Sequence, residues 1–153
     1  MLPIVCNAIT PLLLLALLAL PWFAKSALAR GRFIGLIGAQ TAAGLAATYG
    51  LMALDQAFGW WPSWGLDYST HSAFALSLAL PLVKHHHWAW GGVLIVYGLF
   101  MRQLNYHSWA DMLTTGLAWA ALCLPLVYGI ERFIDCKTQA AQAKNPLPTK
   151  NTR

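Results

Sequence analysis

The sequence is poor in charge. Only 10% of its 153 residues are Asp, Glu, Lys or Arg, and 58% are hydrophobic, whereas a soluble domain typically carries about 25% charged residues. Acidic side chains are the scarcest, because the chain has five of them and its first 54 residues contain no His, Asp or Glu. Such a composition excludes an ordinary soluble domain and predicts an all-α integral membrane protein.

Cysteine is scarce, and the chain begins without a recognisable leader. Cys6, Cys123 and Cys136 share no motif spacing, so we expect them to be packing residues without a disulfide. The N-terminus lacks the basic segment and small-residue cleavage site of a signal peptide, and we expect nothing to be removed. The net charge of +5 comes from residues in short loops and the tail, which predicts no nucleic-acid partner.

Hydrophobic segments take up nearly the whole length of the chain. A helix needs about 20 apolar residues to cross a bilayer, so we predict a transmembrane domain of about five helices over residues 1–135. We expect a polar, disordered cytoplasmic tail over residues 136–153. Gly and Ala recur in the second span, which predicts close packing of this helix inside the bundle. The predicted spans are residues 3–23, 33–58, 69–83, 88–101 and 109–130.

Basic residues fall almost entirely in alternate loops. Arg102 alone lies on one side of the predicted bundle, and the positive-inside rule places the other side in the cytoplasm. We therefore expect a multi-pass protein of the inner (plasma) membrane, with its N-terminus outside and its C-terminus in the cytoplasm. Loops 55–71 and 102–111 then share the external face. The cytoplasmic set comprises Lys25, Arg30, Arg32, Lys84, Arg132 and Lys137.

His107 and Asp111 are the first candidates for chemistry. Residues four apart on a helix lie on the same face, with Cβ atoms roughly 5–6 Å apart. We therefore expect Asp111 to accept a hydrogen bond from one ring nitrogen of His107, which leaves the other nitrogen as base or nucleophile. His71 begins the third predicted span on the same face of the membrane and could protonate a leaving oxygen.

Groups suited to a phosphate lie beside these residues. Arg102 presents a planar set of donors with a permanent charge. Ser69 and Thr70 stand at a helix start, where free backbone N–H groups favour an anion. The combination predicts phosphoryl transfer without a metal or other cofactor, and the membrane location predicts membrane lipids as partners.

Two stretches resemble a known family. STHSAFALSLALPL and MRQLNYHSWADMLTTG resemble the last two motifs of the type 2 phosphatidic acid phosphatase (PAP2) superfamily, over about residues 66–128. The resemblance implies a PAP2-like membrane phosphatase that hydrolyses a lipid phosphate or diphosphate at the periplasmic face through a phosphohistidine. It implies that His107 is the nucleophile, Asp111 its orienting partner, Arg102 the phosphate ligand and His71 the acid.

The family's first motif, a Lys, six residues and Arg-Pro, is absent from its expected place. Lys25 and Arg32 have that spacing, but Phe33 replaces the proline and the predicted topology places both on the cytoplasmic face. At the outer end of the second span, where basic residues are expected, stand Asp55 and Gln56.

Other interpretations are open. THSAFALSLALPL and YHSWADMLTTG are also similar to segments of membrane-bound metal-dependent hydrolases of the YdjM-like kind, which implies His71, His107 and Asp111 as ligands for Zn²⁺ or Mn²⁺. A non-catalytic lipid-binding or assembly protein is a third possibility, and the oligomeric state is undetermined. Arg102 could be a simple interfacial anchor. The run 85–87 of three histidines is expected to form a polar turn.

Overall fold

The computed structural model describes residues 2–23, 27–86 and 89–144, and every regular element in these ranges is a helix. The predicted all-α class is confirmed. The elements are α1 (Leu2–Ala19), the 3-10 helix η1 (Leu20–Phe23), α2 (Ala27–Phe58), α3 (Trp60–Ser63), α4 (Thr70–His86), α5 (Ala89–Gln103) and α6 (Trp109–Lys144).

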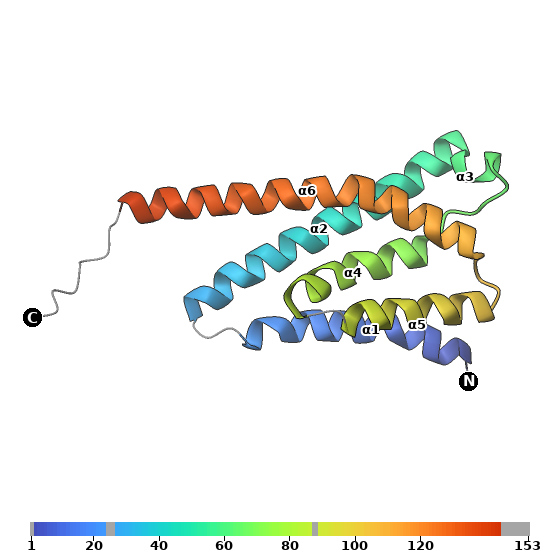
Figure 1. The fold of residues 1–153 in the computed structure, drawn as a ribbon, viewed down its shortest axis with the longest axis horizontal. Coiled ribbons are helices and arrows are strands. Elements are labelled where there is room, and N and C mark those ends of the chain that lie inside the picture. Colours follow the sequence, from blue (N-terminus) through green and yellow to red (C-terminus); the bar gives the residue numbers. More distant parts are fainter. Residues whose placement is uncertain (1, 24–26, 87–88, 145–153) are drawn as a thin grey trace, which may run out of the picture.

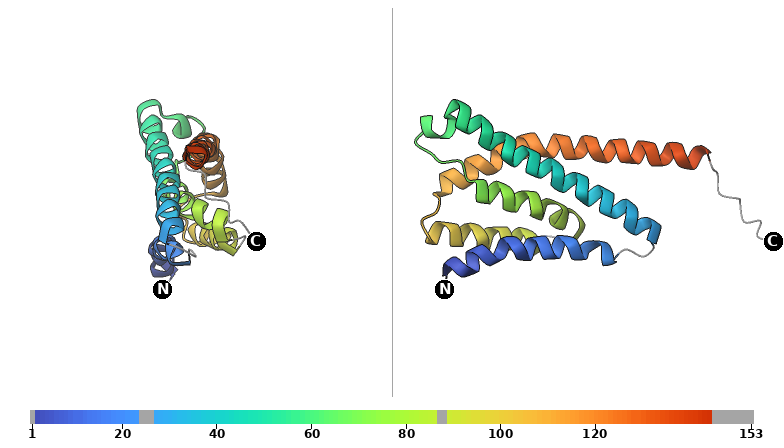
Figure 2. Two further views of the ribbon diagram at one scale, coloured as in Figure 1. Left: turned by 90° about the vertical axis from the view of Figure 1, so that its left-hand side faces the viewer. Right: turned by 180° about the vertical axis from the view of Figure 1, so that it is seen from behind.

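The five long helices run side by side and alternate in direction (Figure 1). The start of α1, the short helix α3 and the connection from α5 to α6 gather at one end of the bundle (Figures 1 and 2). We call this the site end and define it by residues 59–71 and 102–111. The start of α2, the last turn of α4 and the second half of α6 lie toward the opposite end. Loops 55–71 and 102–111, predicted to share one face, therefore do lie together.

Helix α4 occupies the centre of the bundle. It contacts α1, α2, α5 and α6, and side chains on several of its faces, such as Ala73, Leu78 and Leu82, are buried. The outer helices differ, because large apolar side chains on them are uncovered, among them Leu113 and Leu117 of α6, which are 63% and 72% exposed. Apolar residues that face outward on peripheral helices are typical of a surface in contact with lipid.

A single glycine allows the closest helix contact. A Cβ added at Gly44 of α2 would lie 2.8 Å from the Cβ of Ser77 in α4. Beside this contact, Trp119 of α6 donates from Nε1 to the Gly44 carbonyl and to Ser77 Oγ, each at 3.1 Å. The predicted internal packing of the second span is thus found at Gly44. Gly31, Gly35 and Gly38 have no atom within 4 Å of such a Cβ.

Two helices are long and apolar enough to cross a membrane, Arg30–Phe58 within α2 and Trp109–Ala140 within α6. The other three expected spans correspond to α1, α4 and α5, which have 18, 17 and 15 residues. These lengths fall short of the roughly 20 residues that an isolated helix needs to cross a bilayer. Membrane crossing by all five helices therefore stays a prediction.

The predicted boundaries need two corrections. Helix α2 begins at Ala27, ahead of the predicted residue 33, and α6 continues to Lys144, well past residue 130. Residues 136–144, expected to be disordered, are helical because this stretch is rich in Ala, Gln and Lys and contains neither Gly nor Pro; residues 145–153 lie outside the described part. His85 and His86, expected in a turn, belong to the last turn of α4, and residue 87 is outside the described residues.

Candidate functional site

One carboxylate joins the two loops of the site end. Asp111 Oδ1 accepts a hydrogen bond from the backbone N–H of Asp67 at 3.0 Å, and Oδ2 accepts one from the backbone N–H of Ser108 at 2.7 Å. Ser108 Oγ in turn accepts from the backbone N–H of Asp111 at 3.1 Å. This reciprocal pair is a capping box at the start of α6. Asp111 therefore caps its own helix and also holds the loop that precedes α4.

The start of α4 is fixed in a similar way. The backbone N–H of Ser69 donates to Thr115 Oγ1 of α6 at 3.0 Å. Ser69 Oγ is hydrogen-bonded to Ser72 Oγ at 2.7 Å and lies 3.4 Å from the Ser72 backbone nitrogen. Ser69 is fully buried and occupies the N-cap position. Thr115 thereby positions the turn that carries Thr70 and His71.

His107 is half-buried in the connection between α5 and α6. Its ring nitrogen Nδ1 is buried and has no hydrogen-bond partner among the described residues. Burial lowers the pKa of His107, nearby Asp111 and Asp67 oppose that change, and nearby His71 lowers the pKa further. The lowered pKa favours a neutral imidazole at pH 7.

His71 is exposed at the edge of a groove of about 460 Å³ that lies among α1, α2, α4 and α5. The walls of the groove combine aromatic rings with a few hydroxyl groups. It is lined by Thr10, Pro11, Tyr49, Thr70, His71, Phe74 and Tyr97. An apolar groove with a few polar groups at its edge is typical of a site for a small amphiphilic molecule.

The side chain of Arg102 bonds to a residue other than the two histidines. It is exposed in the last turn of α5, and its Nη1 donates to Asn105 Oδ1 at 3.2 Å. Asn105 adopts a left-handed conformation with φ of 55°, which reverses the chain after α5. The guanidinium group is therefore at the site end, but within the described residues it forms no hydrogen bond with His107 or His71.

His71, Thr70, Asp111 and His107 all lie at the site end, and the structure corrects two details of the expected arrangement. The expected hydrogen bond from His107 to Asp111 is not formed. The α-helix begins at Trp109, so His107 precedes the N-cap, and the rule that residues four apart share a helix face does not apply to it. Both oxygens of Asp111 accept backbone N–H groups instead.

Ser69 is the second correction. It was expected to bind phosphate, but its side chain is fully buried and its hydroxyl is already bonded to Ser72. It stabilises the start of α4. Two positioning residues were missed, Ser108 and Thr115. The spacing Ser-x-x-Asp from Ser108 to Asp111 is a recognisable capping signal, whereas nothing local identifies Thr115, whose partner lies 46 positions earlier in the chain.

The residues considered for the missing first motif lie elsewhere. Arg32 forms an ion pair with Asp135 at 3.1 Å toward the opposite end, and Lys25 is outside the described residues. Asp55 Oδ1 accepts from the backbone N–H of Trp61 at 2.8 Å and so stabilises the start of α3. Asp55 also raises the pKa of Tyr68, to about 12, although burial of the phenol is the larger cause.

Within the described residues, no three His, Cys, Asp or Glu side chains are grouped as metal ligands would be. The proposed ligand set of His71, His107 and Asp111 does not form such a group, since the Asp111 oxygens point to backbone amides. Comparison with known proteins found no matching family model, no matching curated protein and no matching solved structure.

Proposed function

We propose that the protein is a five-helix membrane phosphatase that hydrolyses a lipid phosphate or diphosphate at the site end. The observation that carries the proposal is that two histidines lie at the same end of the bundle, His71 in the first turn of α4 and His107 in the α5–α6 connection, where its ring nitrogen Nδ1 is buried and unpartnered among the described residues. Two imidazoles, a nearby carboxylate and a helix start are the groups that metal-free phosphoryl transfer to histidine requires.

The charges along α6 support a position at the membrane surface. Between Asp111 and Glu131 lies an uncharged stretch of residues 112–130. At 1.5 Å per residue this stretch is about 28 Å long, close to the hydrocarbon thickness of a bilayer, about 30 Å. The site end and the opposite end would then lie at the two membrane surfaces. Helix α4 can be shorter because neighbouring helices surround it and shield its ends from lipid.

Basic residues favour one orientation. Arg30, Arg32 and Lys84 lie toward the opposite end, whereas Arg102 is at the site end. By the positive-inside rule the opposite end faces the cytoplasm. The protein would thus sit in the inner (plasma) membrane with its N-terminus and the two histidines outside and its C-terminus in the cytoplasm.

The proposed reaction has two steps. A neutral His107 nitrogen attacks phosphorus and forms an N–P bond while the bond to the lipid oxygen breaks, and protonated His71 gives that oxygen its proton. Water then attacks the phosphohistidine and releases inorganic phosphate, with the same His71, now neutral, accepting a proton from the water. Arg102 would bind the phosphate after exchanging Asn105 for it, and exposed guanidinium groups can make such a change at low cost. The first turn of α4 would add the backbone N–H of His71.

The groove beside His71 supports a lipid substrate. Its mixed aromatic and hydroxyl walls lie between helices that expose apolar side chains, so an acyl or prenyl chain could lie there while its phosphate reaches the histidines. Asp111 in this scheme is a positioning residue, because it orders the loops that carry both histidines without bonding to either ring.

Phosphate release tests the proposal. The substrates are short-chain phosphatidate, phosphatidylglycerol phosphate and polyprenyl diphosphate, each with and without EDTA. We expect release by the wild type to be insensitive to EDTA, and His107→Ala to abolish it. Tyr106→Phe, at the exposed neighbouring position, is the matched control and should be active.

Three results would contradict the mechanism. Full activity of His107→Ala would exclude the phosphohistidine. Loss of activity in EDTA that is restored by Zn²⁺ or Mn²⁺ would assign the site to metal-dependent hydrolysis. No turnover of any substrate, together with a stably co-purifying partner, would assign the protein to the lipid-binding or assembly class.

A further inference from the structure

A second polar cluster lies at the opposite end, far along α6 from the histidines. Gln40 of α2 donates from Nε2 to the carboxylate of Glu131 in α6, and Lys84 near the end of α4 donates to both oxygens of the same carboxylate. One turn further along α6, Asp135 pairs with Arg32. Polar and ionisable side chains that meet between the helices of a membrane bundle are candidates for function.

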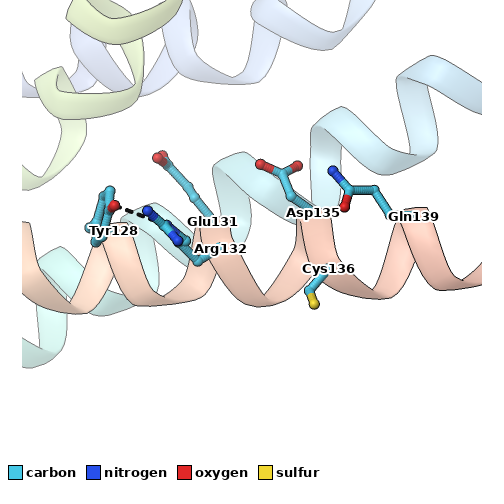
Figure 3. Close-up of a pocket in the computed structure, with 6 residues that line it drawn as sticks. All are labelled: Tyr128, Glu131, Arg132, Asp135, Cys136 and Gln139. Carbon is cyan, nitrogen blue, oxygen red and sulfur yellow. Dashed lines mark hydrogen bonds between the residues drawn. The ribbon is translucent and has the colours of Figure 1, made fainter.

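The cluster borders an open groove of about 210 Å³. Two basic, two acidic and two aliphatic side chains line it, namely Arg32, Leu36, Lys84, Glu131, Ile134 and Asp135. Figure 3 shows Glu131 and Asp135 pointing to the same side of α6, whereas Cys136 points to the other side. The charges that face the groove therefore sum to zero, and both signs are available within it.

Gln40, which is bonded to the groove residue Glu131, carries an unpartnered acceptor. Gln40 is 0% exposed, and its Oε1 is buried without a hydrogen-bond partner among the described residues. The amide cannot satisfy itself by turning over, because its NH₂ group is already engaged by Glu131. Buried polar atoms are nearly always paired, so this oxygen leaves the Gln40–Glu131 contact with an unused acceptor.

The geometry points to a binding site for the phosphoethanolamine headgroup of a zwitterionic phospholipid in the leaflet opposite the histidines. The ammonium group supplies donors for Glu131 and Asp135, and the phosphate accepts from Arg32 and Lys84. Leu36 and Ile134 give the glycerol and the first methylene groups an apolar wall. In the absence of the lipid, the acidic and basic side chains pair with each other.

The charge balance selects against other lipids. Phosphatidylglycerol offers a phosphate but no cation, and so would leave both carboxylates without a partner. Phosphatidylcholine carries a quaternary ammonium that cannot donate a hydrogen bond, and a site built to hydrogen-bond a ligand strongly rejects an analogue that lacks the donor. The aliphatic part of the lining favours a lipid over the free headgroup.

Competitive lipid binding tests the site in the full-length protein. The purified chain in detergent receives equimolar phosphatidylethanolamine, phosphatidylcholine and phosphatidylglycerol with matched acyl chains, and native mass spectrometry measures the bound lipid. We expect about tenfold more phosphatidylethanolamine than either competitor. Equal retention of the three lipids, or preferred retention of phosphatidylglycerol, would overturn the proposal. Displacement of the lipid by millimolar free phosphoethanolamine would assign the groove to a soluble ligand instead.

Two variants locate the binding. Glu131→Gln and Gln40→Leu should each abolish the preference for phosphatidylethanolamine. Arg132→Gln is the matched control, because Arg132 neighbours Glu131 but bonds to the Tyr128 hydroxyl and does not line the groove. A preference unchanged in both test variants would place the lipid elsewhere and contradict the site. The ranking of the three lipids by the wild type decides the question even if a variant does not fold.

Discussion

Replacing Asp111 with Ala tests the central feature of the site end. Residue Asp111 is 8% exposed, and its carboxylate accepts hydrogen bonds from the backbone N–H groups of Asp67 and Ser108. The change would leave both N–H groups without an acceptor and would remove a negative charge from the first turn of α6. It should therefore loosen the loops that lead to His71 and carry His107.

The expected loss of stability can be estimated from these contacts. Hydrogen bonds to a charged group contribute about 1.5–3 kcal/mol each, and a carboxylate in the first turn of a helix adds about 0.3–1 kcal/mol. Two such bonds and the charge give a loss on the order of 3–7 kcal/mol. For a chain of this size, the midpoint of thermal unfolding should fall by on the order of 10 °C.

Thermal unfolding of the detergent-solubilised protein, followed by circular dichroism, measures this loss. Asp111→Asn keeps one acceptor oxygen and should lie between the wild type and Asp111→Ala. Ser108→Ala removes only the other half of the capping box and should cost about 1 kcal/mol. Asp67→Ala is the control, because only the backbone N–H of Asp67 takes part; its unfolding free energy should stay within about 0.5 kcal/mol of the wild type.

One pattern of results would refute this reasoning. If Asp111→Ala unfolds at the wild-type temperature and yet loses all phosphatase activity, then Asp111 acts on the His107 ring directly. The expectation from sequence would then hold, and the backbone contacts would be incidental. Equal destabilisation by Asp67→Ala would also contradict the assignment, because it would show that a side chain and not the N–H group holds the loop.

The remaining predictions concern packing and pH. Gly44→Ala should destabilise the protein by about 1–3 kcal/mol, because the added methyl group would meet Ser77 at 2.8 Å; Gly38→Ala, which meets nothing within 4 Å, should be neutral or stabilise by up to about 1 kcal/mol. Denaturant titrations of both variants decide this. Because folding lowers the pKa of His107, the unfolded chain binds its proton first as pH falls below about 6.5. As the pH falls further, the free energy of unfolding should decrease until the pH passes the pKa of His107 in the folded protein. The decrease should be smaller in His107→Gln, and unfolding measured between about pH 5 and pH 8 tests this.

The all-α fold class could be predicted from the sequence because it depends on amino-acid composition and on the local preference of residues for helix. The scarcity of charge and the long apolar runs predicted helices close to those observed, and two of them have the length and apolarity to cross a membrane. Helix α6 continues past the predicted span because hydrophobicity marks where a membrane segment stops and says little about where a helix stops. Residues 131–144 are polar but strong helix formers.

The sequence predicted which segments lie at the candidate site. Alternation of the helices placed the segments around His71 and His107 at one end, and the structure has them there. The hydrogen bonds were not predictable in the same way. The bond from Asp67 to Asp111 joins residues 44 positions apart, and that from Ser69 to Thr115 joins residues 46 apart. No local pattern indicates such partners.

The sequence by itself thus determined an all-α chain, the ends of most helices and the gathering of two histidines at one end, since these follow from apolar length and alternating direction. Only the tertiary structure decided what Asp111 bonds to, which glycine lies in a helix contact, and that Gln40, Lys84 and Glu131 meet at the other end. Those outcomes depend on the rotation and depth of each helix against its neighbours, and such quantities are set by packing of the whole bundle.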